Sequence, residues 1–168
     1  MKKILLGLIL PVTFLILAAC GNSDNSATPA KTSVTVNISL NGTLGSNAIA
    51  GVGFSVTLPA NVTPEMAGSV VATTVVTPSG IFAGSTIAPV VTYTPAAGAS
   101  PGSLQIIIAS SEAAGATTTG EIVTITLHLA NGSAPVASDI ITTVISVTDT
   151  LGAPISGLST SVSNILLQ

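Results

Sequence analysis

The feature that most constrains this fold is a two-residue alternation of aliphatic and small polar side chains. Between residues 34 and 40, Val34, Val36, Ile38 and Leu40 alternate with Thr, Asn and Ser. The same period recurs at 52–58 and at 123–129. Because successive side chains of a strand point to opposite faces, this pattern predicts strands with one buried and one solvated face.

Turn residues divide the chain after residue 33 into seven to nine such segments. Asn-Gly pairs follow 34–40 and 123–129, and Gly- and Pro-containing stretches separate several others. Further strands are predicted at 70–76, 90–93, 104–109, 140–147 and 158–167. The run at 104–109 is apolar except for Gln105, which predicts a more buried strand. Short strands at this spacing predict an all-β sandwich or barrel and not parallel βαβ units.

The composition is typical of a β protein and argues against some classes of binding partner. Only 5% of the residues are charged, whereas 47% are hydrophobic and 2% aromatic. No arginine is present, and without Lys2 and Lys3 the only cation, Lys31, stands against six carboxylates. Nucleic acid is therefore not an expected partner, since phosphate neutralisation needs Lys or Arg. No cysteine follows Cys20, so no disulfide is expected in the domain.

The N-terminus predicts export. Lys2 and Lys3 precede an apolar run, 4–19, that ends on small residues and then on Cys20. This is the arrangement of a secretory signal peptide, and the run is shorter than the about 20 residues that a membrane-spanning helix needs. The boundary Leu17-Ala18-Ala19-Cys20 resembles the lipobox of bacterial lipoproteins.

The lipobox resemblance implies a diacylglyceryl thioether on Cys20, cleavage after Ala19 and acylation of the new amino terminus. The alternative is an ordinary signal peptide that ends in a cysteine by chance. Two or more acyl chains anchor a protein stably to a membrane. Gly21, in place of aspartate, implies sorting to the outer membrane if the cell has two membranes. We expect a signal peptide at 1–19, a lipidated cysteine and flexible tether at 20–32, and one domain at 33–168 displayed at the cell envelope.

Four segments of the domain resemble the cohesin-like modules, which share a superfamily with cellulose-binding sandwich modules. These segments are 51–59, with the sequence GVGFSVTLP, and 102–108, 120–127 and 147–155. The resemblance implies a nine-stranded jelly-roll β-sandwich with a non-catalytic binding role. Protein–protein interaction is the role we expect, and the alternative is carbohydrate binding linked to polysaccharide degradation.

The titratable residues do not form a recognisable catalytic or metal-binding motif. His128 is the only histidine and falls on the polar side of its alternation, which indicates a surface residue and not a ligand or general base. A Ser-His-Asp arrangement with Asp139 or Asp149 stays open. Asp139 and Asp149 flank one predicted strand, and a cation at this sheet end is the alternative to solvated or turn-capping aspartates. Asp149 precedes Gly152 and is interpreted as a turn-capping residue. We predict no enzyme, no cofactor and no metal site.

Aromatic residues are too few for a sugar-stacking platform. After the signal peptide the chain has Phe54, Phe82 and Tyr93 and no tryptophan. Phe54 is in register with Val52 and Val56, so it is predicted to lie in the core, and Tyr93 to be half exposed. The expected partner is an extracellular protein docked on an uncharged, Thr/Val-rich sheet face. The alternative is a polysaccharide held by shallow hydrogen bonds.

Overall fold

The structure is a computed structural model, and the residues that it describes are 30–168. The predicted signal peptide and Cys20 lie outside the described residues. Within them the chain is all-β, with antiparallel strands and two single 3-10 turns. Residues 30–168 contain no helix long and apolar enough to cross a membrane.

The strands form two large sheets and a small hairpin. Their bounds are β1 (Ser33–Asn41), β2 (Ile49–Leu58), β3 (Val62–Pro64), β4 (Met66–Ala67), β5 (Val70–Val71), β6 (Val76–Pro78), β7 (Val90–Thr94), β8 (Gly102–Ala109), β9 (Gly120–Leu129), β10 (Ile141–Asp149) and β11 (Ser159–Leu167). The 3-10 turns are η1 (Gly80–Phe82) and η2 (Ala137–Asp139).

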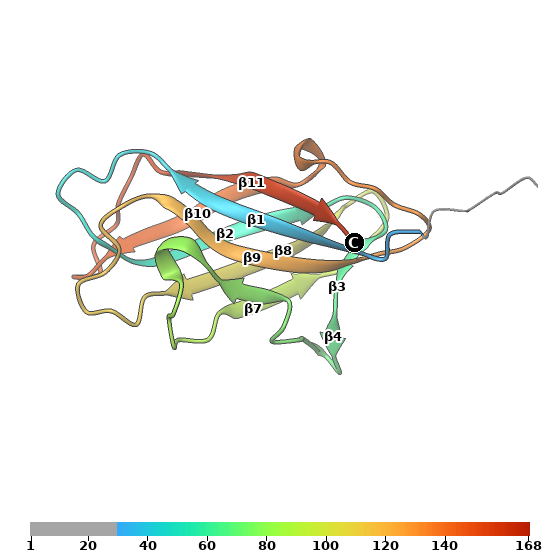
Figure 1. The fold of residues 1–168 in the computed structure, drawn as a ribbon, viewed down its shortest axis with the longest axis horizontal. Coiled ribbons are helices and arrows are strands. Elements are labelled where there is room, and N and C mark those ends of the chain that lie inside the picture. The colour runs from blue at the N-terminus through green and yellow to red at the C-terminus, as the bar shows by residue number, and fades with distance from the viewer. Residues whose placement is uncertain (1–29) are drawn as a thin grey trace, which may run out of the picture.

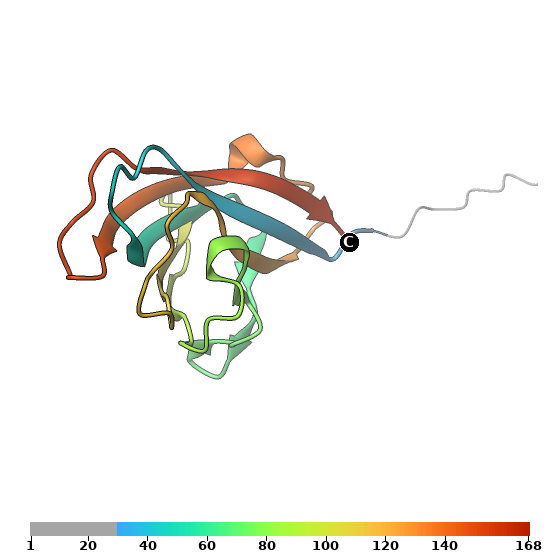
Figure 2. The same cartoon turned by 60° about the vertical axis from the view of Figure 1, so that its left-hand side comes forward.

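The two large sheets lie one over the other in a sandwich-like arrangement (Figures 1 and 2). Sheet A has the order β11-β1-β9, and the short strands β3 and β6 both pair with the outer edge of β9. Sheet B has the order β10-β2-β8-β7. The hairpin β4-β5 stands apart from both sheets.

One hydrophobic core fills the space between the sheets. Alternate residues of β1, from Val34 to Leu40, are at most 1% exposed, as the two-residue period predicts. Phe54 of β2 is fully buried and Phe82 of η1 is 2% exposed, so both phenylalanines belong to this core. The prediction that Phe54 is a core residue is confirmed.

The chain enters and leaves the described domain at the same end (Figure 1). The Thr32 amide donates to the Gln168 carbonyl at 2.8 Å, and the Gln168 amide donates back to Ser33 at 2.8 Å. The opposite end carries the loops 42–48, 110–119 and 150–158. We call these the terminal end and the loop end.

Two of the predicted strands differ from the structure. The segment 70–76 is not one strand but two, β5 and β6, because the chain turns between them where the Val75 amide bonds the Ala72 carbonyl at 3.0 Å. The run 104–109 was predicted to be more buried than the other strands, and it is not. It alternates, and Ile107 is 49% exposed on the outer face of sheet B.

Candidate functional site

The outer face of sheet B is almost free of charge. The inward residues of β2 and β8 are buried, so their alternate residues line the outer face, and most of these are Gly, Ser, Thr or Gln. Asp149, at the loop end, is the only charged residue in the four strands. Its Oδ1 atom accepts bonds from the amides of Leu151 and Ala153 at 2.9 and 2.8 Å, so its charge is occupied locally.

Exposed aliphatic side chains are set among these small polar residues. Ile107 of β8 lies directly opposite Val90 of β7, and both are about half exposed or more. Ile141 of β10 is 60% exposed and lies opposite Thr57, which also points outward. Since directly paired residues share a face, these three side chains belong to one surface.

Two glycines open a groove in the part of this surface nearer the loop end. Gly51 and Gly53 occupy successive outward positions of the central strand β2 and have no side chains there. The groove has a volume of about 380 Å³, and Ile107 borders it on one side and Ser146 on the other. Ser146 packs closely, since its Oγ atom would lie 2.8 Å from a Cβ atom on Gly53. The outer face of sheet B is therefore a hydroxyl-rich surface with exposed aliphatic side chains and a depression toward the loop end, which Asp149 also lines.

The outer face of sheet A has a different character. It carries Glu121 and His128 on β9, together with asparagines of β1 and β11. Asn37 Nδ2 donates to Glu121 Oε2 at 2.8 Å. Leu166 of β11 is the large aliphatic residue exposed on this face, at 53%. The two faces thus differ in exposed aliphatic area, because sheet B exposes Val90, Ile107 and Ile141 whereas sheet A exposes Leu166.

Hydroxyl and amide groups around Glu121 form a small polar network that the sequence did not indicate. The Ser79 hydroxyl and then the Asn37 amide hold the pKa of the Glu121 carboxyl below its ordinary value, and partial burial opposes them. Among residues 30–168, the buried Ser79 Oγ atom makes no hydrogen bond of standard geometry. Asn37 and Glu121 are 84 positions apart, and only the pairing of β1 with β9 brings them together.

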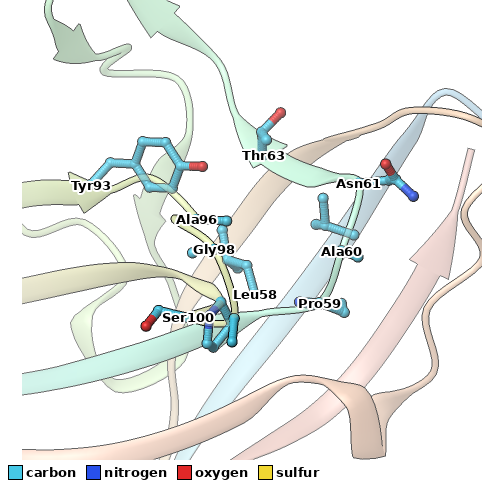
Figure 3. A pocket seen from close by; sticks show the side chains of 13 residues that line it. Leu58, Pro59, Ala60, Asn61, Thr63, Tyr93, Ala96, Gly98 and Ser100 are labelled. Carbon is cyan, nitrogen blue, oxygen red and sulfur yellow. The ribbon is translucent and has the colours of Figure 1, made fainter.

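A pocket of about 290 Å³ lies at the terminal end (Figure 3). One wall is the turn from Leu58 to Thr63, between β2 and β3, and the other is the β7–β8 hairpin. Tyr93 lies on the hairpin side with its ring facing the pocket (Figure 3). Among residues 30–168, no acidic or basic side chain lines the pocket. Tyr93 is half-buried, as predicted.

His128 is exposed on β9, opposite Ser33 of β1 and Thr63 of β3. The prediction that it is a surface residue is confirmed. Among residues 30–168, no hydrogen bond joins His128 to a carboxylate. The two candidate aspartates are engaged elsewhere, Asp149 in its own turn and Asp139 with the Val136 amide at 2.9 Å.

Two aspartates, Asp139 and Asp149, act as turn caps. Asp149 caps the turn that follows β10, which confirms its interpretation as a turn-capping residue. Asp139 Oδ2 caps η2 in a similar way. In the described part of the chain, no three residues of the types His, Cys, Asp and Glu cluster closely enough to hold a metal ion. Cys20, the predicted lipidation site, lies outside that part.

Scans against protein-family models, curated proteins and solved structures found no match to this chain. The candidate site is therefore defined by its own geometry, namely the face of sheet B and the Tyr93 pocket.

Proposed function

We propose that this chain is a lipid-anchored envelope protein whose all-β domain binds a protein partner through the outer face of sheet B. The anchor is the predicted lipid on Cys20, and the resemblance to cohesin-like modules supports a jelly-roll sandwich with a binding role. The observation that carries the proposal is the contrast between the two outer faces.

This contrast is one of exposed aliphatic area, since each sheet has a single carboxylate, Glu121 in sheet A and Asp149 in sheet B. The centre of a protein interface is depleted in charged residues and excludes water around apolar anchors. Ile107, Val90 and Ile141 supply such anchors on sheet B, and hydroxyl groups surround them. The groove over Gly51 and Gly53 gives a partner side chain a place to insert.

The terminal end supports display of this face. Thr32, where the expected tether joins the domain, is next to Gln168 at one end of the sandwich. The strands of sheet B run from the terminal end to the loop end (Figure 1). The described residues before β1 therefore leave the outer face of sheet B uncovered. A flexible tether of the predicted length at 20–32 would leave the face accessible to soluble or membrane-bound partners.

The experiment replaces one exposed aliphatic residue on each face by lysine. Ile107→Lys puts a charge at the groove, and Leu166→Lys puts the same charge on sheet A at an equally exposed position. The size of the native complex is then measured by sedimentation of detergent extracts from cells that express each full-length variant. We expect Ile107→Lys to shift the protein to its monomeric size and Leu166→Lys to leave the complex intact.

Circular dichroism and thermal melting of both variants provide the folding control. Because both positions are about half exposed, neither substitution is expected to change stability by more than about 0.5 kcal/mol. A wild-type protein that sediments as a monomer, or two variants with the same sedimentation, would contradict the proposal.

A further inference from the structure

The Tyr93 pocket has two walls that are fixed by hydrogen bonds in their own turns. On the hairpin side, the Ala97 and Ser100 amides donate to each other's carbonyls, both at 3.0 Å. On the other side, the Val62 amide bonds the Pro59 carbonyl at 3.3 Å. The pocket is thus formed before any ligand arrives, which lowers the entropic cost of binding.

Asn61 fixes the Leu58–Thr63 wall by hydrogen bonds to the loop that follows β9. Its Oδ1 atom accepts a bond from Asn131 Nδ2 at 3.0 Å, and its carbonyl accepts one from the Ala130 amide at 2.9 Å. The turn that forms the wall is therefore tied to the loop after β9. The Ser133 hydroxyl also donates to the Ala60 carbonyl at this wall. None of these hydrogen bonds, all among residues 30–168, involves the Tyr93 hydroxyl.

Tyr93 is held by close packing against its neighbouring strand. A Cβ atom on Gly102 would lie 3.3 Å from Tyr93 Oη and 3.4 Å from Cε2, so the absence of a side chain at Gly102 makes room for the ring. The pocket therefore presents one fixed aromatic ring with a free hydroxyl. Thr63 and Ser100 add hydroxyl groups at its border (Figure 3).

The lining excludes a charged ligand and limits its size. Removing a charge from water without a partner is costly, and the part of the chain that the structure describes places no acidic or basic side chain in the pocket. A volume of about 290 Å³ is at the small end of ligand pockets, which span about 300–1,000 Å³. The pocket suits a single ring with one apolar face, to pack on Tyr93, and with hydroxyl groups toward the rim.

We propose that this pocket binds one neutral pyranose unit, such as a terminal sugar of an envelope glycan. The site is separate from the proposed protein-docking face, because it opens at the terminal end between the β2–β3 turn and the β7–β8 hairpin. A single ring does not form a platform for an extended polysaccharide, so the site takes one sugar residue at a time.

The experiment uses the protein's own fluorescence. The sequence contains one tyrosine and no tryptophan, so the emission of the full-length protein reports on Tyr93 alone. The purified protein, held in a zwitterionic detergent without sugar headgroups, is titrated with glucose, galactose, mannose and N-acetylglucosamine. We expect a saturable change with at least one of them and a dissociation constant in the millimolar range, as suits about twelve non-hydrogen atoms.

Two charged sugars of the same ring size, glucuronate and glucosamine, test the exclusion of charge. A matched pair of variants tests the location: Ala60→Phe fills the pocket, and Ala67→Phe places the same ring at another exposed alanine, on β4. We expect Ala60→Phe to weaken the response at least tenfold and Ala67→Phe to leave it unchanged. Ile107→Lys, which is designed to abolish protein docking, is also expected to leave the response unchanged.

Circular dichroism establishes that each variant is folded. The proposal is overturned if no neutral sugar gives a saturable change, if the charged sugars bind as well as the neutral ones, or if Ala60→Phe and Ala67→Phe behave alike. These outcomes do not depend on the docking face, whose own test is the size of the native complex.

Discussion

Gly80 in η1 packs directly against the backbone of Glu121 in β9. Gly80 has a φ of +53°, and a Cβ atom there would overlap the Glu121 carbonyl oxygen and lie 2.7 Å from Glu121 Cβ. This contact places η1, with the buried ring of Phe82, against sheet A. The connection between β6 and β7 therefore depends on a position that has no side chain.

Gly80→Ala is expected to destabilise the domain by at least about 3 kcal/mol, because it adds a steric overlap to the about 1–2 kcal/mol cost of a left-handed backbone. Gly84→Ala is the control, since Gly84 has a φ of +81° with open space around it, and we expect it to cost only the backbone term. Urea unfolding of both variants gives the comparison. Equal losses of unfolding free energy would show that the contact with Glu121 is not the cause.

Asn61 and Asn131 are the two residues other than glycine with a positive φ among residues 30–168, at 63° and 54°, and their side chains bond each other. Asn61→Ala loses this bond and the tolerance of asparagine for the left-handed region, so we expect a loss of about 1–2 kcal/mol. Asn61→Gly loses the same bond, but glycine adopts a positive φ without steric cost. We therefore expect it to lower the free energy of unfolding by about 0.5–1 kcal/mol. Thermal melting ranks the two variants, and a glycine variant less stable than the alanine one would be inconsistent with this account.

Asn37 is expected to account for part of the lowered pKa of the Glu121 carboxyl. Because its pKa is lower in the folded than in the unfolded state, the ionised form stabilises the domain near neutral pH. This contribution is lost as the pH falls from about 4.3, the usual value for glutamate, through the folded pKa. Asn37→Ala removes a 2.8 Å bond to the carboxylate and should raise the pKa.

An NMR titration of the Glu121 side-chain carbon measures this pKa in each variant. Asn164→Ala is the control, because Asn164 lies opposite Asn37 on the adjacent strand and makes no bond to Glu121 among the described residues. We expect the pKa to rise with Asn37→Ala and to stay in place with Asn164→Ala. Two unchanged values would assign the lowered pKa to Ser79 alone.

Membrane attachment is expected to depend on one sulfur atom. Cys20→Ser removes the thiol that would carry the diacylglyceryl group, so the protein should leave the membrane fraction and lose labelling by radioactive palmitate. Cell fractionation followed by immunoblotting measures the release, and wild-type protein in the same cells is the reference. Undiminished membrane retention of Cys20→Ser would contradict lipid anchoring.

The alternation of residues was sufficient to predict most long strands. The period at 34–40 and 52–58 matches β1 and β2, because each strand has one face in the core. The same reasoning failed at 104–109, where Ile107 continues an apolar run and yet points outward. Periodicity could not detect this, since a buried strand and one with an exposed aliphatic patch have similar sequences.

The candidate site was predictable only in its general character. An uncharged, hydroxyl-rich sheet face follows from a composition with so few charges. Its position on sheet B could not be derived, because it depends on which strands become neighbours. The pocket beside Tyr93 depends on contacts between 58–63 and 93–102, which lie far apart in the sequence, and on the small residue at Gly102. No local motif marks either feature.

Site-specific photo-crosslinking in intact cells tests the central proposal, docking on sheet B, most directly. A photoreactive amino acid is placed at Ile107 of the full-length protein in one strain and at Leu166 in another, since these residues are equally exposed on opposite sheets. After illumination, we expect one discrete adduct of defined mass from position 107 and none from position 166. No adduct at 107, or the same adducts from both positions, would contradict the account.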